Sequence, residues 1–134
     1  MEEIRIVVVG DERCGKTSLI TRFISDTLPA SYKPTSFDKF LVTKDISGSL
    51  FNLTVWDTSG SASFDTVRPL SYGEADIFII CFKISDPLSL YNVKSRWMPE
   101  IRKLSKVDSS SSDIMKIMMM IMMMMRKILL LMMC

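Results

Sequence analysis

The segment that most constrains this chain spans residues 4–18, IRIVVVGDERCGKTS. It opens with a β-branched run that carries a single charge, which is typical of a strand buried on both faces. The spacing G-x-x-x-x-G-K-T then begins at Gly10, and a helical pattern with one apolar face follows over residues 16–25. Strand, glycine turn and helix in this order are the context of a phosphate-binding loop. A Gly-Lys-Thr that merely opens a helix is the less favoured alternative.

The residue types of this loop indicate its chemistry. Glycine lets the backbone fold closely around an anion, and successive N–H groups and the helix dipole then point at the phosphates. We expect the ammonium of Lys16 to reach the terminal phosphates and the hydroxyl of Thr17 to bind Mg²⁺. The residues predicted to contact the nucleotide here are Gly10, Asp11, Glu12, Arg13, Cys14, Gly15, Lys16, Thr17 and Ser18.

Bulk composition narrows the class of protein. At 134 residues the chain is expected to hold one domain, short for an α/β nucleotide-binding fold. A net charge of +2 indicates no nucleic-acid partner. The acidic start, MEEIRI, gives no sign of a signal peptide. Three cysteines without metal-type spacing suit a reducing compartment, so we expect a cytoplasmic protein.

A second motif follows a predicted β-hairpin. Residues 37–46 and 50–57 alternate around a Ser-Gly turn, and the second of these strands ends on Asp57. A carboxylate at the end of a buried strand is suited to hold the hydration shell of Mg²⁺. The nearby Gly60 would let a backbone N–H approach the γ-phosphate. Alone, D-T-S-G is a common turn; together with the phosphate loop it indicates a metal–nucleotide site.

The middle of the chain predicts one more strand and a helix. Residues 76–84 contain the apolar run IFIICF, and the S-D-P sequence that follows is a good helix start. Apolar residues then recur at spacings of three and four from Leu90 to Leu104. We expect Trp97 on this face to pack in the core rather than to contact a ligand.

Five stretches carry a family resemblance: CGKT (14–17), PTSFD (34–38), WDTSG (56–60), RPLSY (68–72) and NVKSRWMPEI (92–101). Over residues 1–103 the chain resembles the Rho family of small GTPases, nearest to its Rac-like branch. The resemblance implies an α/β P-loop NTPase (Rossmann-like) G domain, a mixed sheet with flanking helices, here C-terminally incomplete. It also implies GTP or GDP and Mg²⁺ as cofactors, and effector proteins and exchange factors as partners in signal transduction.

Residue roles carry over from the matching motifs. The resemblance implies that Thr35 coordinates Mg²⁺ in the triphosphate state together with Thr17 and Asp57. Gly60 would order the second of the two loops that change shape with the nucleotide. Aromatic residues at the start of the hairpin would contact effectors, with ordinary strand packing as the alternative. The implied effector-binding residues are Thr35, Phe37, Asp38 and Phe40.

Departures from the family pattern predict weak or absent GTP hydrolysis. Glu12 stands where the family has a glycine that leaves room for the attacking water, and Ser61 replaces the Gln that orients this water. Arg13 could pair with Glu12 or with a phosphate. Leu28 replaces a Phe that stacks on guanine, which predicts faster nucleotide release. Slow hydrolysis with easy exchange would leave the protein mostly triphosphate-bound.

The pattern fails after residue 103. Residues 104–134 form a Ser-rich linker and a low-complexity tail that holds ten of the 12 methionines. The N/T-K-x-D and S-A motifs that read guanine are missing, so guanine selectivity is in doubt and one sheet edge is expected to be uncovered. A Met-rich segment could cover this edge as a helix.

Three interpretations of the tail compete. A membrane span is disfavoured because the longest apolar run has nine residues. An interfacial anchor would need a polar face, which this run lacks. A segment that was never selected as protein is favoured. Cys134 is the last residue and makes no prenylation box, so membrane association is not supported, and a peripheral membrane location would require a different C-terminus.

Three functions therefore stay open. The first is a Rho-type GTP-binding switch with impaired hydrolysis. The second is a nucleotide-independent decoy that binds effectors through the same loop, or a truncated product that fails to fold. The third is a P-loop ATPase fragment. It is disfavoured because WDTSG and RPLSY match the small-GTPase pattern. Dependence of effector binding on nucleotide and Mg²⁺ separates the first two.

Overall fold

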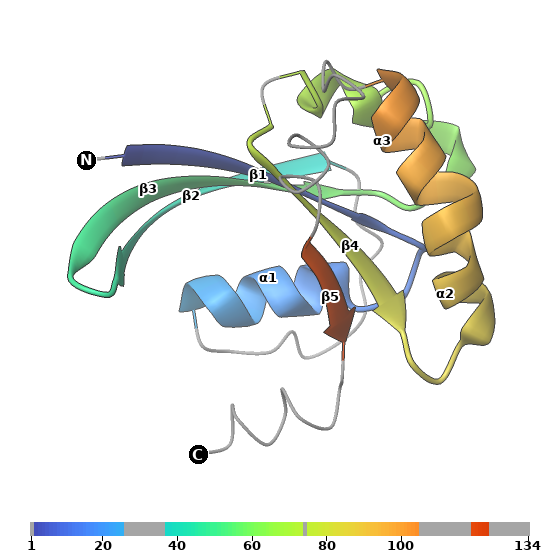
Figure 1. Ribbon diagram of the computed structural model, residues 1–134, viewed down its shortest axis with the longest axis horizontal. Coiled ribbons are helices and arrows are strands. Elements are labelled where there is room, and N and C mark those ends of the chain that lie inside the picture. Colours follow the sequence, from blue (N-terminus) through green and yellow to red (C-terminus); the bar gives the residue numbers. More distant parts are fainter. Residues whose placement is uncertain (1, 26–36, 74, 105–118, 124–134) are drawn as a thin grey trace.

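A five-stranded mixed sheet forms the centre of the protein (Figure 1). The computed structural model describes residues 2–25, 37–73, 75–104 and 119–123. Across the sheet the strand order is β2-β3-β1-β4-β5, and only β2 runs antiparallel to its neighbour. The strands are β1 (Glu2–Gly10), β2 (Phe37–Ile46), β3 (Ser49–Thr58), β4 (Ile77–Lys83) and β5 (Met119–Met123).

Helices cover both faces of this sheet (Figure 1). One face carries α1 and the other carries α2 and α3, which are joined by a π-helical turn over Val93–Trp97. Two short 3₁₀ turns, Ala62–Phe64 and Arg68–Ser71, lie between β3 and β4. The helix bounds are α1 (Lys16–Ser25), α2 (Pro87–Asn92) and α3 (Met98–Leu104).

Strand alternation divides the core into two clusters, because successive side chains point to opposite faces. The cluster on the side of α2 and α3 contains Val7, Val9, Tyr72, Phe78, Ile80, Phe82, Val93, Trp97 and Ile101. The cluster on the side of α1 contains Val8, Cys14, Ile20, Leu53, Val55 and Cys81. The α/β architecture predicted from the sequence is confirmed.

The predicted hairpin is confirmed. Phe37 pairs with Thr58 and Ile46 with Ser49, and the turn between the strands has φ values of 53° at Ser47 and 85° at Gly48. The Gly48 N–H donates to Asp45 Oδ1 at 2.9 Å, which closes this turn. Gly48 has no Cβ, so it tolerates the left-handed backbone conformation that the turn requires.

The first strand is buried along only half of its length. Val7, Val8 and Val9 are buried, whereas the residues before Ile6 are exposed or half-buried. The reason is the register: β4 pairs with β1 from Ile6 onward, so the start of β1 has β3 as its neighbour and no strand on the other side among the described residues. The prediction of a strand buried on both faces from residue 4 is therefore wrong for its first half.

The prediction that a helix of the tail covers the open edge of β4 is wrong, and β5 becomes the edge strand of the sheet among the described residues. Residues 119–123 form β5, which pairs in parallel with β4 from Ile79↔Met119 to Lys83↔Met123. An edge strand presents a row of unpaired N–H and C=O groups, and an added strand satisfies them directly, which a helix packed over the edge would not. Residues 105–118, which include most of the predicted Ser-rich linker, lie outside the described residues.

The helix predicted after residue 85 is confirmed. Asp86 caps it, since its Oδ1 accepts a hydrogen bond of 3.2 Å from the Leu88 N–H, and Pro87 occupies the first turn. Trp97 is fully buried, as predicted. Among the residues that the structure describes, no helix has the length and apolar character needed to cross a bilayer.

Candidate functional site

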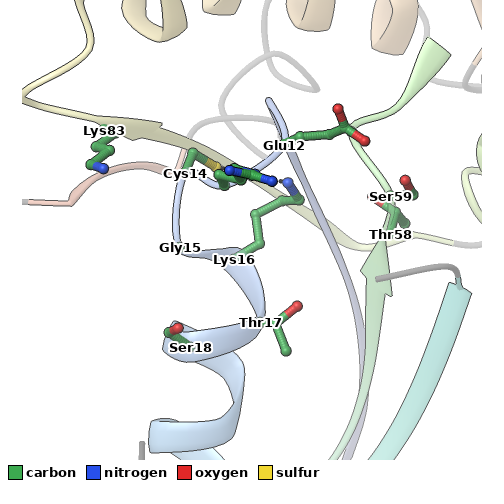
Figure 2. A pocket seen from close by; sticks show the side chains of 11 residues that line it. Glu12, Cys14, Gly15, Lys16, Thr17, Ser18, Thr58, Ser59 and Lys83 are labelled. Carbon is green, nitrogen blue, oxygen red and sulfur yellow. Dashed lines mark hydrogen bonds between the residues drawn. The ribbon is translucent and has the colours of Figure 1, made fainter. Parts of the chain in front are cut away.

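A cavity of about 320 Å³ opens where β1, β3 and β4 end and α1 begins (Figure 2). Ligands of open α/β sheets bind at this carboxyl end of the strands. The phosphate-loop motif and the D-T-S-G motif, about forty residues apart in the sequence, both contribute to its wall. The lining residues are Glu12, Arg13, Cys14, Gly15, Lys16, Thr17, Ser18, Thr58, Ser59, Gly60 and Lys83.

The loop has the backbone that an anion cradle needs. Arg13 has φ 61° and Gly15 has φ 99°, so left-handed residues turn the chain around the cavity. At Gly10 (φ 150°) a Cβ would collide with the Cys81 carbonyl oxygen of the neighbouring strand. Glycine is therefore required there, where β1 meets β4 and the loop starts.

Lys16 spans this loop from the first turn of α1. Its ammonium donates to the carbonyl oxygens of Gly10 at 2.8 Å and Asp11 at 2.7 Å, and the residue is 5% exposed. The positive charge is thereby held inside the cradle with its stem buried. That this ammonium reaches the terminal phosphates stays a prediction.

Thr17, which lines the cavity, contacts Asp57, which lies behind the lining residues. The Thr17 hydroxyl donates to Asp57 Oδ2 at 2.7 Å, and Asp57 is fully buried at the end of β3. Mg²⁺ prefers oxygen ligands and uses one or two protein carboxylates together with phosphates, so this donor set fits the ion. Thr17 and Asp57 would hold it. Thr35, the third ligand implied by the sequence, lies outside the described residues.

Gly60 joins the two motifs. A Cβ on this residue would collide with Gly10 O and would lie 2.6 Å from the Glu12 N atom. Any side chain at Gly60 would force the second motif away from the phosphate loop. The sequence placed this glycine at the γ-phosphate, and the structure places it against the loop that would bind that phosphate.

The sequence did not predict how Asp11 is held. Its Oδ1 accepts from Trp97 Nε1 at 2.8 Å and its Oδ2 accepts from Asn92 Nδ2 at 2.7 Å. Asp11 was predicted as a nucleotide contact, yet both carboxylate oxygens serve to fasten the loop to the helical segment after β4. Asp11 is not among the residues that line the cavity.

Two arginines hold the chain just after Asp57. Arg68 donates to Ser59 O at 2.7 Å and to Ser61 O at 2.8 Å, and Arg96 donates to Gly60 O at 2.8 Å. Three successive carbonyl groups are thus bound by two guanidinium groups. Sequence reasoning missed both residues, because a long-range contact to main-chain carbonyls has no local signature.

Both guanidinium groups also lie over the Trp97 ring, at 4.7 Å for Arg68 and 4.2 Å for Arg96. Cation–π contact of this kind is strongest with tryptophan. Arg68 is fully buried, and its charge is balanced by Glu100 Oε1 at 2.6 Å and Asp65 Oδ1 at 3.0 Å. The buried cation is therefore paired and hydrogen-bonded, as burial of a charge requires.

Glu100 also accepts a hydrogen bond from the Tyr72 hydroxyl. Burial, followed by the hydrogen bond to Glu100 and its negative charge, raises the pKa of Tyr72 well above its usual range. At Asp65, burial opposes ionisation, but hydrogen bonds from Arg68 and Arg96 outweigh it and lower the pKa. Tyr72 is therefore a neutral donor within this cluster.

The two cysteines of the site are buried. Cys14 is 3% exposed and Cys81 is fully buried, and burial raises the pKa of both thiols. Raised pKa values disfavour the reactive thiolate. Cys14, predicted from the sequence to contact the nucleotide, lines the cavity as a small apolar side chain packed against α1 and β4.

The implied effector residues fall into different environments. Phe40 packs against the core cluster on the α1 side, and the Phe37 ring lies 5.1 Å from that of Trp56. Both contacts agree with the alternative of strand packing, though neither ring is fully buried. Asp38 is exposed, as is Leu41, which is 75% exposed.

Sequence reasoning also missed Lys83 as part of the cavity wall. The signal that could have found it is strand alternation, since Ile79, Cys81 and Lys83 share one face of β4 and β4 ends beside the phosphate loop.

This geometry defines a P-loop nucleotide-binding domain with a Ras-like fold. Residues 5–124 match the model of the Ras family, and the chain belongs to that family. It is similar to the Rho-related GTP-binding protein RhoD of Homo sapiens, with 38% identity over 106 residues. That similarity covers 79% of this chain and 50% of RhoD, so the chain spans about half the length of the curated relative it matches. The two findings support a Rho-like small GTPase.

Proposed function

We propose that the chain is a GTP-binding switch of the Rho type, nearest to the Rac-like branch, that acts in cytoplasmic signal transduction with weak or absent hydrolysis. The observation that carries the proposal is the Thr17–Asp57 hydrogen bond of 2.7 Å beside the Lys16 ammonium. It brings a hydroxyl and a carboxylate, both magnesium-type ligands, next to a phosphate cradle.

Each residue has a defined part in nucleotide binding. The loop N–H groups between Gly10 and Thr17 and the Lys16 ammonium would hold the phosphates. Thr17 and Asp57 would hold Mg²⁺, which neutralises phosphate charge when bound. Gly60 packs on the phosphate loop, so binding of the terminal phosphate would shift Gly60 and, with it, the segment that Arg68 holds.

The two departures from the family pattern support impaired hydrolysis. Glu12 lines the cavity and brings a negative charge to the wall that faces the terminal phosphate. The Ser61 hydroxyl is engaged in its own turn, where it is 2.9 Å from Ser63 Oγ and caps the 3₁₀ segment at residues 62–64. A short side chain turned into a local cap is unsuited to orient a water.

Effector proteins and exchange factors are the proposed partners. Leu41 and Asp38 lie exposed on β2, at the free edge of the sheet among the described residues. Because they are three residues apart on one strand, their side chains point to opposite faces of the sheet. An exposed leucine on an edge strand suits the apolar centre of a protein interface.

One observation favours a second candidate, a nucleotide-independent effector-binding decoy. Arg68 and Arg96 hold the carbonyls of residues 59–61 through the protein alone. The segment after Asp57 would then keep its position whether or not a nucleotide is bound, as a protein that does not switch requires.

The test is binding of a fluorescent GTP analogue to the 134-residue chain with and without Mg²⁺, in competition with unlabelled GTP and ATP. The switch proposal expects Mg²⁺-dependent binding that GTP displaces better than ATP. Equal displacement by ATP would refute selectivity for guanine. Absence of binding, together with retained effector binding, would leave the decoy.

A further inference from the structure

The cavity has a second lysine that the phosphate-loop motif does not include. Lys83 is the last residue of β4 and lines the same cavity as Lys16. Figure 2 shows it beyond Cys14 and Ser18, on the opposite side from Glu12 and Ser59. The two lysines therefore lie at different ends of the space available to a ligand.

Strand register explains this position. Gly10, the first residue of the loop, pairs with Cys81, so Lys83 lies two residues further toward the cavity on the neighbouring strand. Cys81 belongs to the core cluster on the α1 side, together with Cys14. Because side chains alternate along a strand, Lys83 points to the same face of the sheet as Cys81. This is the α1 side, where the phosphate loop also lies.

The backbone of Lys83 is held in place by one buried hydroxyl. Its N–H donates to Ser89 Oγ at 2.8 Å, and that hydroxyl lies 3.1 Å from Lys83 O and 2.7 Å from Asp86 O. Ser89 is 1% exposed. The lysine stem thus starts from a rigid point at the rim, independently of what its side chain contacts.

Charge distribution gives the cavity two ends. Glu12 lines one end, whereas Ser18 and Lys83 line the other. Gly60 lies against the Glu12 backbone, so the terminal phosphate belongs at the Glu12 end. A nucleotide whose terminal phosphate lies near Gly60 points its nucleoside end toward Lys83. Within the described part of the chain, no salt bridge occupies the Lys83 ammonium.

We propose that Lys83 is a second phosphate-binding cation, which contacts the α-phosphate at the nucleoside end of the cavity. This inference rests on the proposed nucleotide-binding function and deepens it. A lysine is a point charge with three donors and binds phosphate without reading the base. It would add affinity for nucleotides in general, in a chain whose guanine-reading motifs are missing from the sequence.

The experiment compares Lys83→Gln and Lys83→Arg with the matched control Lys94→Gln, which removes an exposed lysine from the helical segment after β4. Dissociation constants for GDP, GTP and ADP are measured in the full chain by displacement of a fluorescent analogue. Because Lys83→Gln removes a charge-assisted hydrogen bond, we expect it to raise the dissociation constants of all three nucleotides about tenfold. Lys83→Arg retains most of the affinity, and Lys94→Gln has no effect.

Three outcomes overturn the assignment. Equal affinities for Lys83→Gln and Lys94→Gln, with binding intact in the unmodified chain, refute the role of Lys83 and leave the nucleotide site standing. A loss confined to guanine nucleotides means that Lys83 contacts the base. No nucleotide binding by the unmodified chain refutes the proposed function and this inference with it. Far-ultraviolet circular dichroism of Lys83→Gln, expected to match the unmodified chain, separates lost binding from lost folding.

Discussion

Trp97 Nε1 donates a hydrogen bond of 2.8 Å to Asp11 Oδ1. This bond fastens the phosphate loop to the π-helical turn between α2 and α3, on the face of the sheet opposite α1. Asn92 occupies the second carboxylate oxygen of Asp11. Because the same tryptophan ring lies beneath Arg68 and Arg96, one side chain connects the loop to the segment after Asp57. The two walls of the cavity are thereby built on a common support.

Replacement of Asp11 by Asn should weaken nucleotide binding through loss of loop position. An amide has one acceptor oxygen, so one of the two donors would lose its partner at a cost of about 1–3 kcal/mol. We expect a lower free energy of unfolding and an affinity for GDP reduced about tenfold. Asp45→Asn is the control, since an Asn oxygen can still accept from Gly48 in the exposed hairpin turn. Unchanged affinity in Asp11→Asn would mean that the loop keeps its shape without this anchor.

Replacement of Thr17 by Val should abolish the dependence of nucleotide binding on Mg²⁺. Valine keeps the shape of threonine but removes the hydroxyl that lies 2.7 Å from Asp57 Oδ2. A titration with Mg²⁺ at constant nucleotide measures the effect, and Thr17→Ser, which retains a hydroxyl, should preserve the response. A Mg²⁺ response that survives in Thr17→Val would exclude Thr17 as a ligand.

Restoring the family residues at Glu12 and Ser61 should restore hydrolysis. The double change Glu12→Gly and Ser61→Gln removes a charged side chain from the cavity wall and supplies a side chain long enough to orient water. Single-turnover release of phosphate from bound GTP should rise on the order of tenfold or more. Ser63→Gln is the control, because it places the same amide two residues away. No gain in the double variant would locate the defect elsewhere in the site.

The sequence predicted the part of the site that depends on local motifs. Gly10 and Lys16 lie where the glycine-rich spacing placed them, and Asp57 follows from the end of an alternating strand. Arg68 was missed because its role arises only when segments far apart in the chain are brought together, whereas Lys83 was missed although strand alternation could have placed it. The helix predicted over the sheet edge failed for a different reason. Apolar periodicity cannot distinguish a short buried strand from a helix, and the open edge of β4 selected the strand over residues 119–123.

Replacement of Arg68 by Met should destabilise the fold strongly. The change leaves Glu100 without its 2.6 Å cationic partner and removes the donors to two main-chain carbonyls. Breaking a buried ion pair on one side costs about 3–5 kcal/mol. Urea unfolding followed by tryptophan fluorescence measures this loss, with exposed Arg102→Met as the control. A cost of less than about 1 kcal/mol, the range of surface ion pairs, would show that the buried cluster adds little to stability.

The same cluster should make the fold sensitive to alkali through Tyr72. Burial and the hydrogen bond to Glu100 raise the pKa of this phenol in the folded state, whereas in the unfolded chain it titrates near 10. The unfolded state therefore releases a proton above about pH 10 while the folded state keeps it, so the stability that this pKa difference contributes is fully present below that pH and is lost as the pH rises. In Tyr72→Phe this term is absent, and the free energy of unfolding should fall less steeply between about pH 10 and pH 11 than in the unmodified chain. Tyr91→Phe, at an exposed position, should follow the unmodified curve. Identical slopes for Tyr72→Phe and the unmodified chain would mean that Tyr72 ionises in the folded state as freely as in water.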